Sequence, residues 1–241
     1  MNPFNYDLGD LTQSRILNTF SRFPGDMYTD KHIVYRKSPE LEKFRDSSIL
    51  LVGGGPSTVD FFEEWEGLDV DYRWTVNHFY QNLSVRQVHF DLLSLSTDID
   101  FHNKTLLDYL DIEQSLVAVE PRVEWDRKKR FINEEFYETN KLICFSTHFA
   151  GKIGCCARVM ILAAQIGVKE IYMIGMDGPK PMFENKHAFK RVSVKIPSGI
   201  TPENAHAIYL DQYNVFWDYM RKNWPNTKCI SLDNNIYHET I

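Results

Sequence analysis

One stretch of the chain combines an apolar run with residues that could bind a phosphorylated ligand. In "SILLVGGGPS" (48–57), Gly53, Gly54 and Gly55 follow the apolar run and precede Ser57. Three adjacent glycines cost backbone entropy, so they indicate either a tight turn or a ligand against the main chain. The N–H groups of a following helix would bind an anion. The segment matches neither GxGxxG nor a P-loop, so both interpretations stay open.

Three further polar residues each follow a short run that is predicted to be a strand. They are Asn77, Asp91 and Asp177. An asparagine can both donate to and accept from a base or a sugar. An aspartate can bond a ligand or hold Mg²⁺ near a phosphate. A simple turn explains each of these residues about as well.

Two histidines are candidate general bases, because histidine titrates near neutral pH. His187 lies within the irregular segment 178–205 and His206 follows its end. This segment contains four prolines and two glycines, and such long loops in compact domains are usually functional lids or disordered. A lone loop histidine is more often simply exposed. The residues alone therefore leave both interpretations open, a general base or an exposed side chain.

Apolar runs alternate with helical segments, which predicts an α/β fold: a Rossmann-like, mostly parallel sheet with helices on both faces. Helices are expected from Ser57 to Trp65, at 154–167 and at 208–223. The residues that follow parallel strands meet at one edge of the sheet, so the polar residues above are expected to converge there. The strands are predicted at 49–52, 72–76, 87–90, 115–119, 141–145, 170–174 and 228–232.

The length of 241 residues suits one α/β domain better than two full domains. We expect an N-terminal extension at 1–46, with a short helix at 11–20. A single domain would follow at 47–241, and it contains the lid-like segment 178–205.

The composition excludes several classes of function. The formal net charge is −6, so a broad basic face for nucleic acid is not expected. The four cysteines form no CxxC pattern and no zinc-site spacing, so we expect no metal site and no disulfide framework. No run approaches about 18 apolar residues and the first residues do not form a signal peptide. These features predict a cytoplasmic protein without a membrane span.

Three motifs in order carry a resemblance to known proteins: "ILLVGGGPS", "VNHFY" (76–80) and "GVKEIYMIGMD" (167–177). This set resembles the bacterial lipooligosaccharide sialyltransferases. It equally resembles the broader family of motility-accessory-factor glycosyltransferases and 6-hydroxymethylpterin pyrophosphokinase-like proteins. The similarity covers roughly residues 48–232. It implies a nucleotide-activated sugar as donor, with CMP-sialic acid favoured, and an acceptor glycan or small molecule. It also implies no separate cofactor and a possible homo-oligomer.

The resemblance also assigns roles to single residues. It implies that "NAHAIY" (204–209) matches the segment with the catalytic histidine, so His206 is the candidate base. Asp91 falls where the sialyltransferases have an asparagine near the donor, and Asp177 matches the aspartate that closes the late strand. The residues that it places against the nucleotide are Gly54, Gly55, Ser57, Asn77, Gly154 and Cys155, and Gly53 belongs to the same rim.

One departure from the sialyltransferases leaves other functions open. Gly178-Pro179 stands where they have aromatic residues that stabilise the leaving phosphate, and Tyr209 or Phe189 is the candidate substitute. One alternative is a diphosphokinase that moves pyrophosphate from ATP to a pterin-like alcohol. It would need Mg²⁺ held by carboxylates such as Asp91 and Asp177. A nucleotide-binding protein without catalysis is the other alternative.

Overall fold

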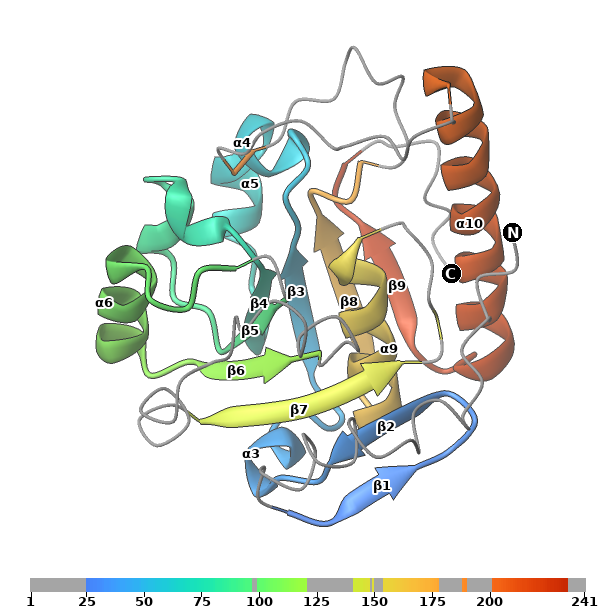
Figure 1. Ribbon diagram of the computed structural model, residues 1–241, viewed down its shortest axis with the longest axis horizontal. Coiled ribbons are helices and arrows are strands. Elements are labelled where there is room, and N and C mark those ends of the chain that lie inside the picture. The colour runs from blue at the N-terminus through green and yellow to red at the C-terminus, as the bar shows by residue number, and fades with distance from the viewer. Residues whose placement is uncertain are drawn as a thin grey trace.

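A mostly parallel sheet organises the part of the chain that the computed structural model describes. That part comprises residues 25–96, 99–120, 141–147, 149, 154–177, 188–189 and 201–233. Within it, nine strands form one sheet in the order β1-β2-β7-β6-β5-β4-β3-β8-β9 (Figure 1). The pairs from β7 to β9 are parallel, and only β1–β2 and β2–β7 are antiparallel. The predicted α/β class with a Rossmann-like sheet is therefore confirmed.

The strands are β1 (Met27–Thr29), β2 (Ile33–Arg36), β3 (Ser48–Val52), β4 (Tyr72–Val76), β5 (Leu92–Leu95), β6 (Leu116–Val119), β7 (Leu142–Thr147), β8 (Glu170–Ile174) and β9 (Lys228–Ser231). The α-helices are α3 (Pro39–Glu42), α4 (Ser57–Asp60), α5 (Phe62–Glu66), α6 (Lys104–Glu113), α9 (Cys155–Ile166) and α10 (Pro202–Asn223). Two short 3₁₀ helices are η1 (Phe79–Gln81) and η2 (Val85–Gln87).

Helices cover both faces of the sheet. The chain steps from β3 to β6 in one direction across the sheet and from β7 through β8 to β9 in the other. Crossovers between parallel strands are right-handed, so the two directions place their helices on opposite faces. Figure 1 shows α4, α5 and α6 on one side of the sheet and α9 and α10 on the other.

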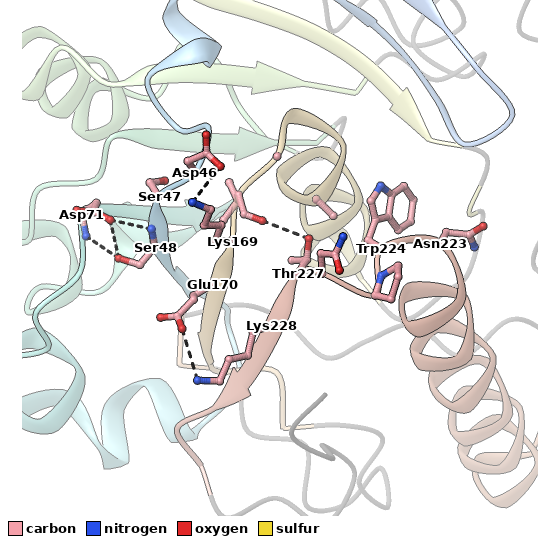
Figure 2. A pocket seen from close by; sticks show the side chains of 15 residues that line it. Asp46, Ser47, Ser48, Asp71, Lys169, Glu170, Asn223, Trp224, Thr227 and Lys228 are labelled. Carbon is pink, nitrogen blue, oxygen red and sulfur yellow. Dashed lines mark hydrogen bonds and ion pairs between the residues drawn. The ribbon is translucent and has the colours of Figure 1, made fainter.

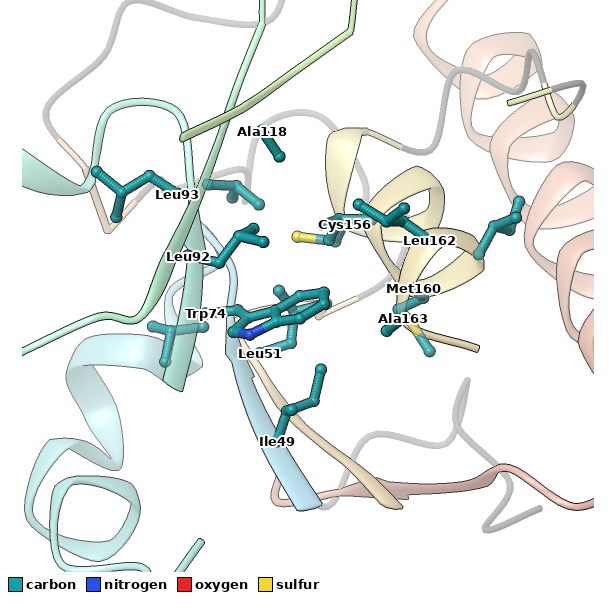
Figure 3. Close-up of a cluster of buried hydrophobic side chains, with 14 of the residues drawn as sticks. Ile49, Leu51, Trp74, Leu92, Leu93, Ala118, Cys156, Met160, Leu162 and Ala163 are labelled. Carbon is teal, nitrogen blue, oxygen red and sulfur yellow. The ribbon is translucent and has the colours of Figure 1, made fainter. Parts of the chain in front are cut away.

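Helix α9 is the buried helix of the fold. Its sequence is apolar nearly all round, and Gly167 ends it with a positive φ of 95°, a conformation that suits glycine. Figure 3 shows Cys156, Met160 and Ala163 of α9 turned toward the sheet, against Trp74 of β4. Trp74 pairs in register with strand neighbours on both sides. The helix and the central strands thus share one core.

The predicted strand at 87–90 is wrong, and the true strand is β5. The Tyr109 hydroxyl accepts from the Phe90 N–H and donates to the Val88 carbonyl, both at 2.9 Å. A tyrosine of α6 therefore satisfies the backbone where a neighbouring strand was expected. The ladder begins only when the Asp91 N–H donates to the Arg73 carbonyl at 2.7 Å. Asp91 consequently precedes the strand instead of following it.

The other predicted elements agree with the structure to within a few residues, with two exceptions. The helix expected from Ser57 to Trp65 breaks at Phe61 into α4 and α5. Helix α10 starts at Pro202, so the last residues of the lid-like segment are helical. The helix expected at 11–20 lies outside the described residues.

The segment expected to be an N-terminal extension contributes β1, β2 and α3. Strand β2 pairs with β7, and the loop before it contacts α10. There, His32 Nδ1 lies 2.6 Å from the Tyr219 hydroxyl, and its ring packs against Trp224. The domain boundary near residue 46 stays a prediction. Among the described helices, none is both long and apolar enough to span a bilayer.

Replacing Met160 with alanine should lower the free energy of unfolding by about 2–5 kcal/mol, because it leaves a cavity between α9 and the sheet. Met160 is fully buried. The matched control is Ile112→Ala on α6, where the side chain is 74% exposed and the change should stay within about 0.5 kcal/mol. Urea unfolding measures both. Equal effects of the two substitutions would contradict this assignment of the core.

Candidate functional site

The glycine loop, residues 53–57, is bonded to the end of β8. The Gly53 N–H donates to the Ile174 carbonyl and the Gly55 N–H donates to the Gly175 carbonyl, each at 2.8 Å. These bonds continue the pairing of β3 with β8 past the point where both strands end. The loop is therefore part of the sheet edge and is held by it.

The same proximity explains two of the three glycines. A Cβ atom on Gly53 would lie 2.5 Å from the Gly175 carbonyl oxygen, and one on Gly55 would lie 1.6 Å from Oδ2 of Asp177. Gly175 has a φ of 72°, and a Cβ there would lie 2.1 Å from the Thr58 hydroxyl. The protein's own β8 end approaches the bare backbone, so the tight-turn reading holds at these positions.

Ser57 joins the loop to two carboxyl groups. Its N–H lies 3.2 and 3.4 Å from the two oxygens of Asp177, and its hydroxyl donates to Asp233 at 3.3 Å. The hydroxyl also accepts from the Gly175 N–H at 2.9 Å. Ser57, Asp177 and Asp233 are all buried. The structure thus brings Ser57 and Asp177 together, as expected, but through a direct bond between them.

Asn77 joins three elements of the same edge. Its φ of 49° lies in the left-handed region that asparagine tolerates. Its Oδ1 accepts from the Ser96 N–H and its Nδ2 donates to Cys155 Sγ, each at 2.9 Å. The end of β4 therefore contacts both the segment after β5 and the first residue of α9. Asn77 and Cys155, which the resemblance places near the same nucleotide, are in direct contact.

The start of α9 is open in the described structure. No described side chain caps the first turn, and the N-cap is Gly154, with a φ of 93°. No described atom would lie within 4 Å of a Cβ at Gly154. The first N–H groups of a helix lack partners inside the helix and carry a partial positive charge. This end of a 12-residue helix is suited to an anion.

A buried ion pair supports the first turn of α9. Arg158 Nε forms a short ion pair with Glu120, and both side chains are at least nine-tenths buried. The Thr147 hydroxyl adds a bond to Glu120 at 3.5 Å. The pair ties α9 to the ends of β6 and β7, and a buried pair of this kind is costly to break. Sequence reasoning missed it, although Arg158 is the one charged residue in an apolar helix.

Asp91 lies away from the other candidates. Its carboxyl group accepts from the Arg73 N–H at 2.9 Å and lies 3.6 Å from Lys43 Nζ. Asp91 is level with Arg73 at the start of β4, roughly 13 Å along the strand from Asn77. We call the edge of the sheet where the parallel strands end the carboxyl edge. The expectation that Asp91 follows a strand and lies at this edge is therefore wrong. Asp91 and Asp177 stand at opposite edges and cannot hold one Mg²⁺ together.

The two candidate histidines differ in whether the structure describes their position. His187 lies outside the described residues. Residue 206 belongs to α10, which returns from the carboxyl edge to the start of the parallel strand β9. The Tyr213 hydroxyl donates to the Met176 carbonyl at 3.4 Å. This bond places the turn of α10 that contains Tyr213 beside the segment that follows β8. Position 206 is two turns earlier in the helix, about 10 Å from Tyr213 along the helix axis.

A short piece of the lid-like segment rests on the glycine loop. The Ala188 N–H donates to the Gly54 carbonyl at 2.9 Å, and Asn82 Nδ2 donates to the Ala188 carbonyl at 3.0 Å. Asn82 Oδ1 is bound by the next residues of its own turn, which fixes the orientation of the amide. Phe189 is 1% exposed, so it belongs to the core and is a poor candidate for contact with a leaving phosphate.

One groove lies at the opposite, amino edge of the sheet, where the parallel strands begin (Figure 2). Its volume is about 900 Å³, and it is lined mainly by residues 46–48, 167–170 and 223–228. Four of its five charged residues form two ion pairs: Lys169 with Asp46 at 3.1 Å and Lys228 with Glu170 at 3.5 Å. The fifth, Asp71, accepts from the N–H and hydroxyl of Ser48. These pairs leave little net charge for a ligand. The described residues also contain no group of three or more metal-binding side chains.

The sequence matches no protein-family model and no curated protein. The fold is similar to that of the monofunctional α-2,3-sialyltransferase Cst-I from Campylobacter jejuni, with a TM-score of 0.51 and 14% identity over 80% of this chain and 78% of that one. The sialyltransferase CstII from the same organism, in complex with cytidine-5′-monophosphate, gives a TM-score of 0.48 and 14% identity over 80% and 82% of the two chains. At this identity the similarity to Cst-I shows a shared fold and nothing further.

In the native protein at pH 8, iodoacetamide should modify Cys155 first. Cys155 is half-buried at the open start of α9. Burial raises the pKa of Cys229 to about 12 and the pKa of Cys144 above its ordinary value. A higher pKa leaves less thiolate at pH 8 and slows alkylation. Mass spectrometry of timed samples measures the order of modification, with urea-unfolded protein as control. Early modification of Cys229 would contradict this burial pattern.

Proposed function

We propose that this protein is a glycosyltransferase that binds a nucleotide-activated sugar at the carboxyl edge of its sheet, with CMP-sialic acid the favoured donor. The observation that carries the proposal is the open start of α9 beside Asn77. The similarity of the fold to Cst-I supports it. The order of the three sequence motifs supports it as well.

The phosphate of the donor is assigned to the first turn of α9. Gly154 has no side chain to obstruct it, and the first-turn N–H groups supply donors. Asn77 stands beside this turn and is neutral, so it does not repel a phosphate. Its amide keeps a second hydrogen for the nucleotide while the first stays on Cys155. The pair of Arg158 and Glu120 keeps the turn in place.

The chemistry follows from this placement. His206 takes the proton of an acceptor hydroxyl, and the acceptor oxygen attacks the anomeric carbon of the sugar. The bond from that carbon to the phosphate oxygen breaks, and the nucleoside monophosphate leaves with the electron pair. Negative charge grows on the phosphate during this step, and the N–H groups of α9 stabilise it. The position of residue 206 in the part of α10 that begins at the carboxyl edge supports this role.

The alternatives have less support. The diphosphokinase lacks the proposed pair of metal-binding carboxylates, because Asp91 and Asp177 stand at opposite edges of the sheet. A binding protein without catalysis keeps the same nucleotide site. It differs only in turnover, so an assay with acceptor glycans separates it from the enzyme.

CMP should stabilise the protein without Mg²⁺, and it should protect Cys155 from iodoacetamide, because the phosphate covers the start of α9. Thermal shift with CMP, UDP, GDP and ATP, each with and without Mg²⁺, measures the first effect. Mass spectrometry measures the second, with cytidine as the ligand that lacks the phosphate. Stabilisation by ATP and Mg²⁺ alone would favour the diphosphokinase.

Replacing His206 with alanine should lower kcat about 10²–10⁴-fold and leave the Kd for CMP unchanged. The matched control is His89→Ala, because His89 is paired with Glu113 near the amino edge and should not affect turnover. Both variants are compared by release of CMP from CMP-sialic acid with an acceptor glycan. Unchanged turnover in the His206 variant removes this histidine from the mechanism.

A further inference from the structure

The glycine loop has the sequence of an anion-binding turn, but a carboxyl group of the protein occupies that position. In Rossmann-like domains this turn and the helix after it receive a pyrophosphate. Here the Ser57 N–H is bound to Asp177. Asp177 Oδ2 also lies only 1.6 Å from where a Cβ of Gly55 would be. The space against the bare backbone is therefore already filled.

Two hydrogen bonds to the residues just before Asp177 hold it in this position. Two residues before it, the Gly175 N–H donates to the Ser57 hydroxyl at 2.9 Å. One residue before it, the Met176 carbonyl accepts from the Tyr213 hydroxyl of α10. Asp177 itself is 8% exposed. Moving its carboxyl group away would leave the buried Ser57 N–H without this acceptor, which carries a cost in free energy.

Ser57 has no donor left for a second anion. Its N–H is used by Asp177 and its hydroxyl donates to Asp233. Asp233 is also buried and accepts from Ser231. A phosphate that approached this end of α4 would meet acceptor oxygens instead of N–H donors. A phosphate and a carboxylate can both only accept hydrogen bonds, so they repel one another at hydrogen-bond distance.

We propose that Asp177 determines donor specificity because it holds a carboxylate where a second phosphate would bind and repels that phosphate, so that the site accepts nucleoside monophosphates and their esters and rejects nucleoside diphosphates. The inference rests on the proposed nucleotide site at this edge. The open start of α9 takes one phosphate, and the glycine loop next to it takes none. Asp177 thus selects CMP-type donors over donors of the UDP or GDP type.

The test is a set of Kd values, measured by calorimetry, for CMP, CDP, UMP and UDP. The native protein should bind each monophosphate about tenfold or more tightly than its diphosphate, which is about 1.4 kcal/mol. In Asp177→Asn the amide can donate to a phosphate, so the ratio should fall at least severalfold through tighter diphosphate binding. The matched control is Asp108→Asn, at an exposed position of α6, where the ratio should not change.

Each outcome decides one or both of the two claims, the CMP donor and the role of Asp177. Equal affinity of the native protein for CMP and CDP overturns the specificity proposal, whether or not the Asp177→Asn variant folds, and leaves the CMP donor standing. Preference for UMP over UDP without binding of CMP overturns the CMP donor and supports the role of Asp177. An unchanged ratio in Asp177→Asn contradicts the role of Asp177, and binding of no nucleotide contradicts both claims.

Discussion

The bonds between the glycine loop and the end of β8 set the geometry of the whole carboxyl edge. Gly53 and Gly55 donate to the last carbonyls of β8, and Gly175 donates back to the Ser57 hydroxyl. The backbones come so close that only glycine fits at these positions. The direction in which α4 begins, and the place of the carboxyl group that follows β8, both result from this contact.

The two helices that start at this edge therefore differ in what they can bind. Asp177 closes the start of α4, whereas no described side chain caps α9. Asn77 and the buried pair of Glu120 and Arg158 hold the first turn of α9 in place. A single open helix end next to a closed one is a physical basis for recognising one phosphate. The amino edge, where four of the five charged residues of the groove form two ion pairs, offers no comparable arrangement among the described residues.

Hydrophobic patterning was sufficient to predict most of the sheet and the buried helix α9, because these elements are apolar runs that end at glycine or at polar residues. It failed at residues 87–90, where the Tyr109 hydroxyl takes the place of a neighbouring strand. That error moved Asp91 to the wrong edge. The type and order of Ser57, Asn77 and Asp177 predicted their convergence. Their actual contacts depend on tertiary distances, which no local pattern contains.

The central claim is that the start of α9 holds the donor phosphate while Asp177 stays on the glycine loop. A crystal structure of the complex with CMP tests it most directly. We expect phosphate oxygens within hydrogen-bond distance of the first-turn amides of α9, with the Asp177 carboxyl group still bonded to the Ser57 N–H. A phosphate bound to the Ser57 N–H, with Asp177 displaced, would contradict it.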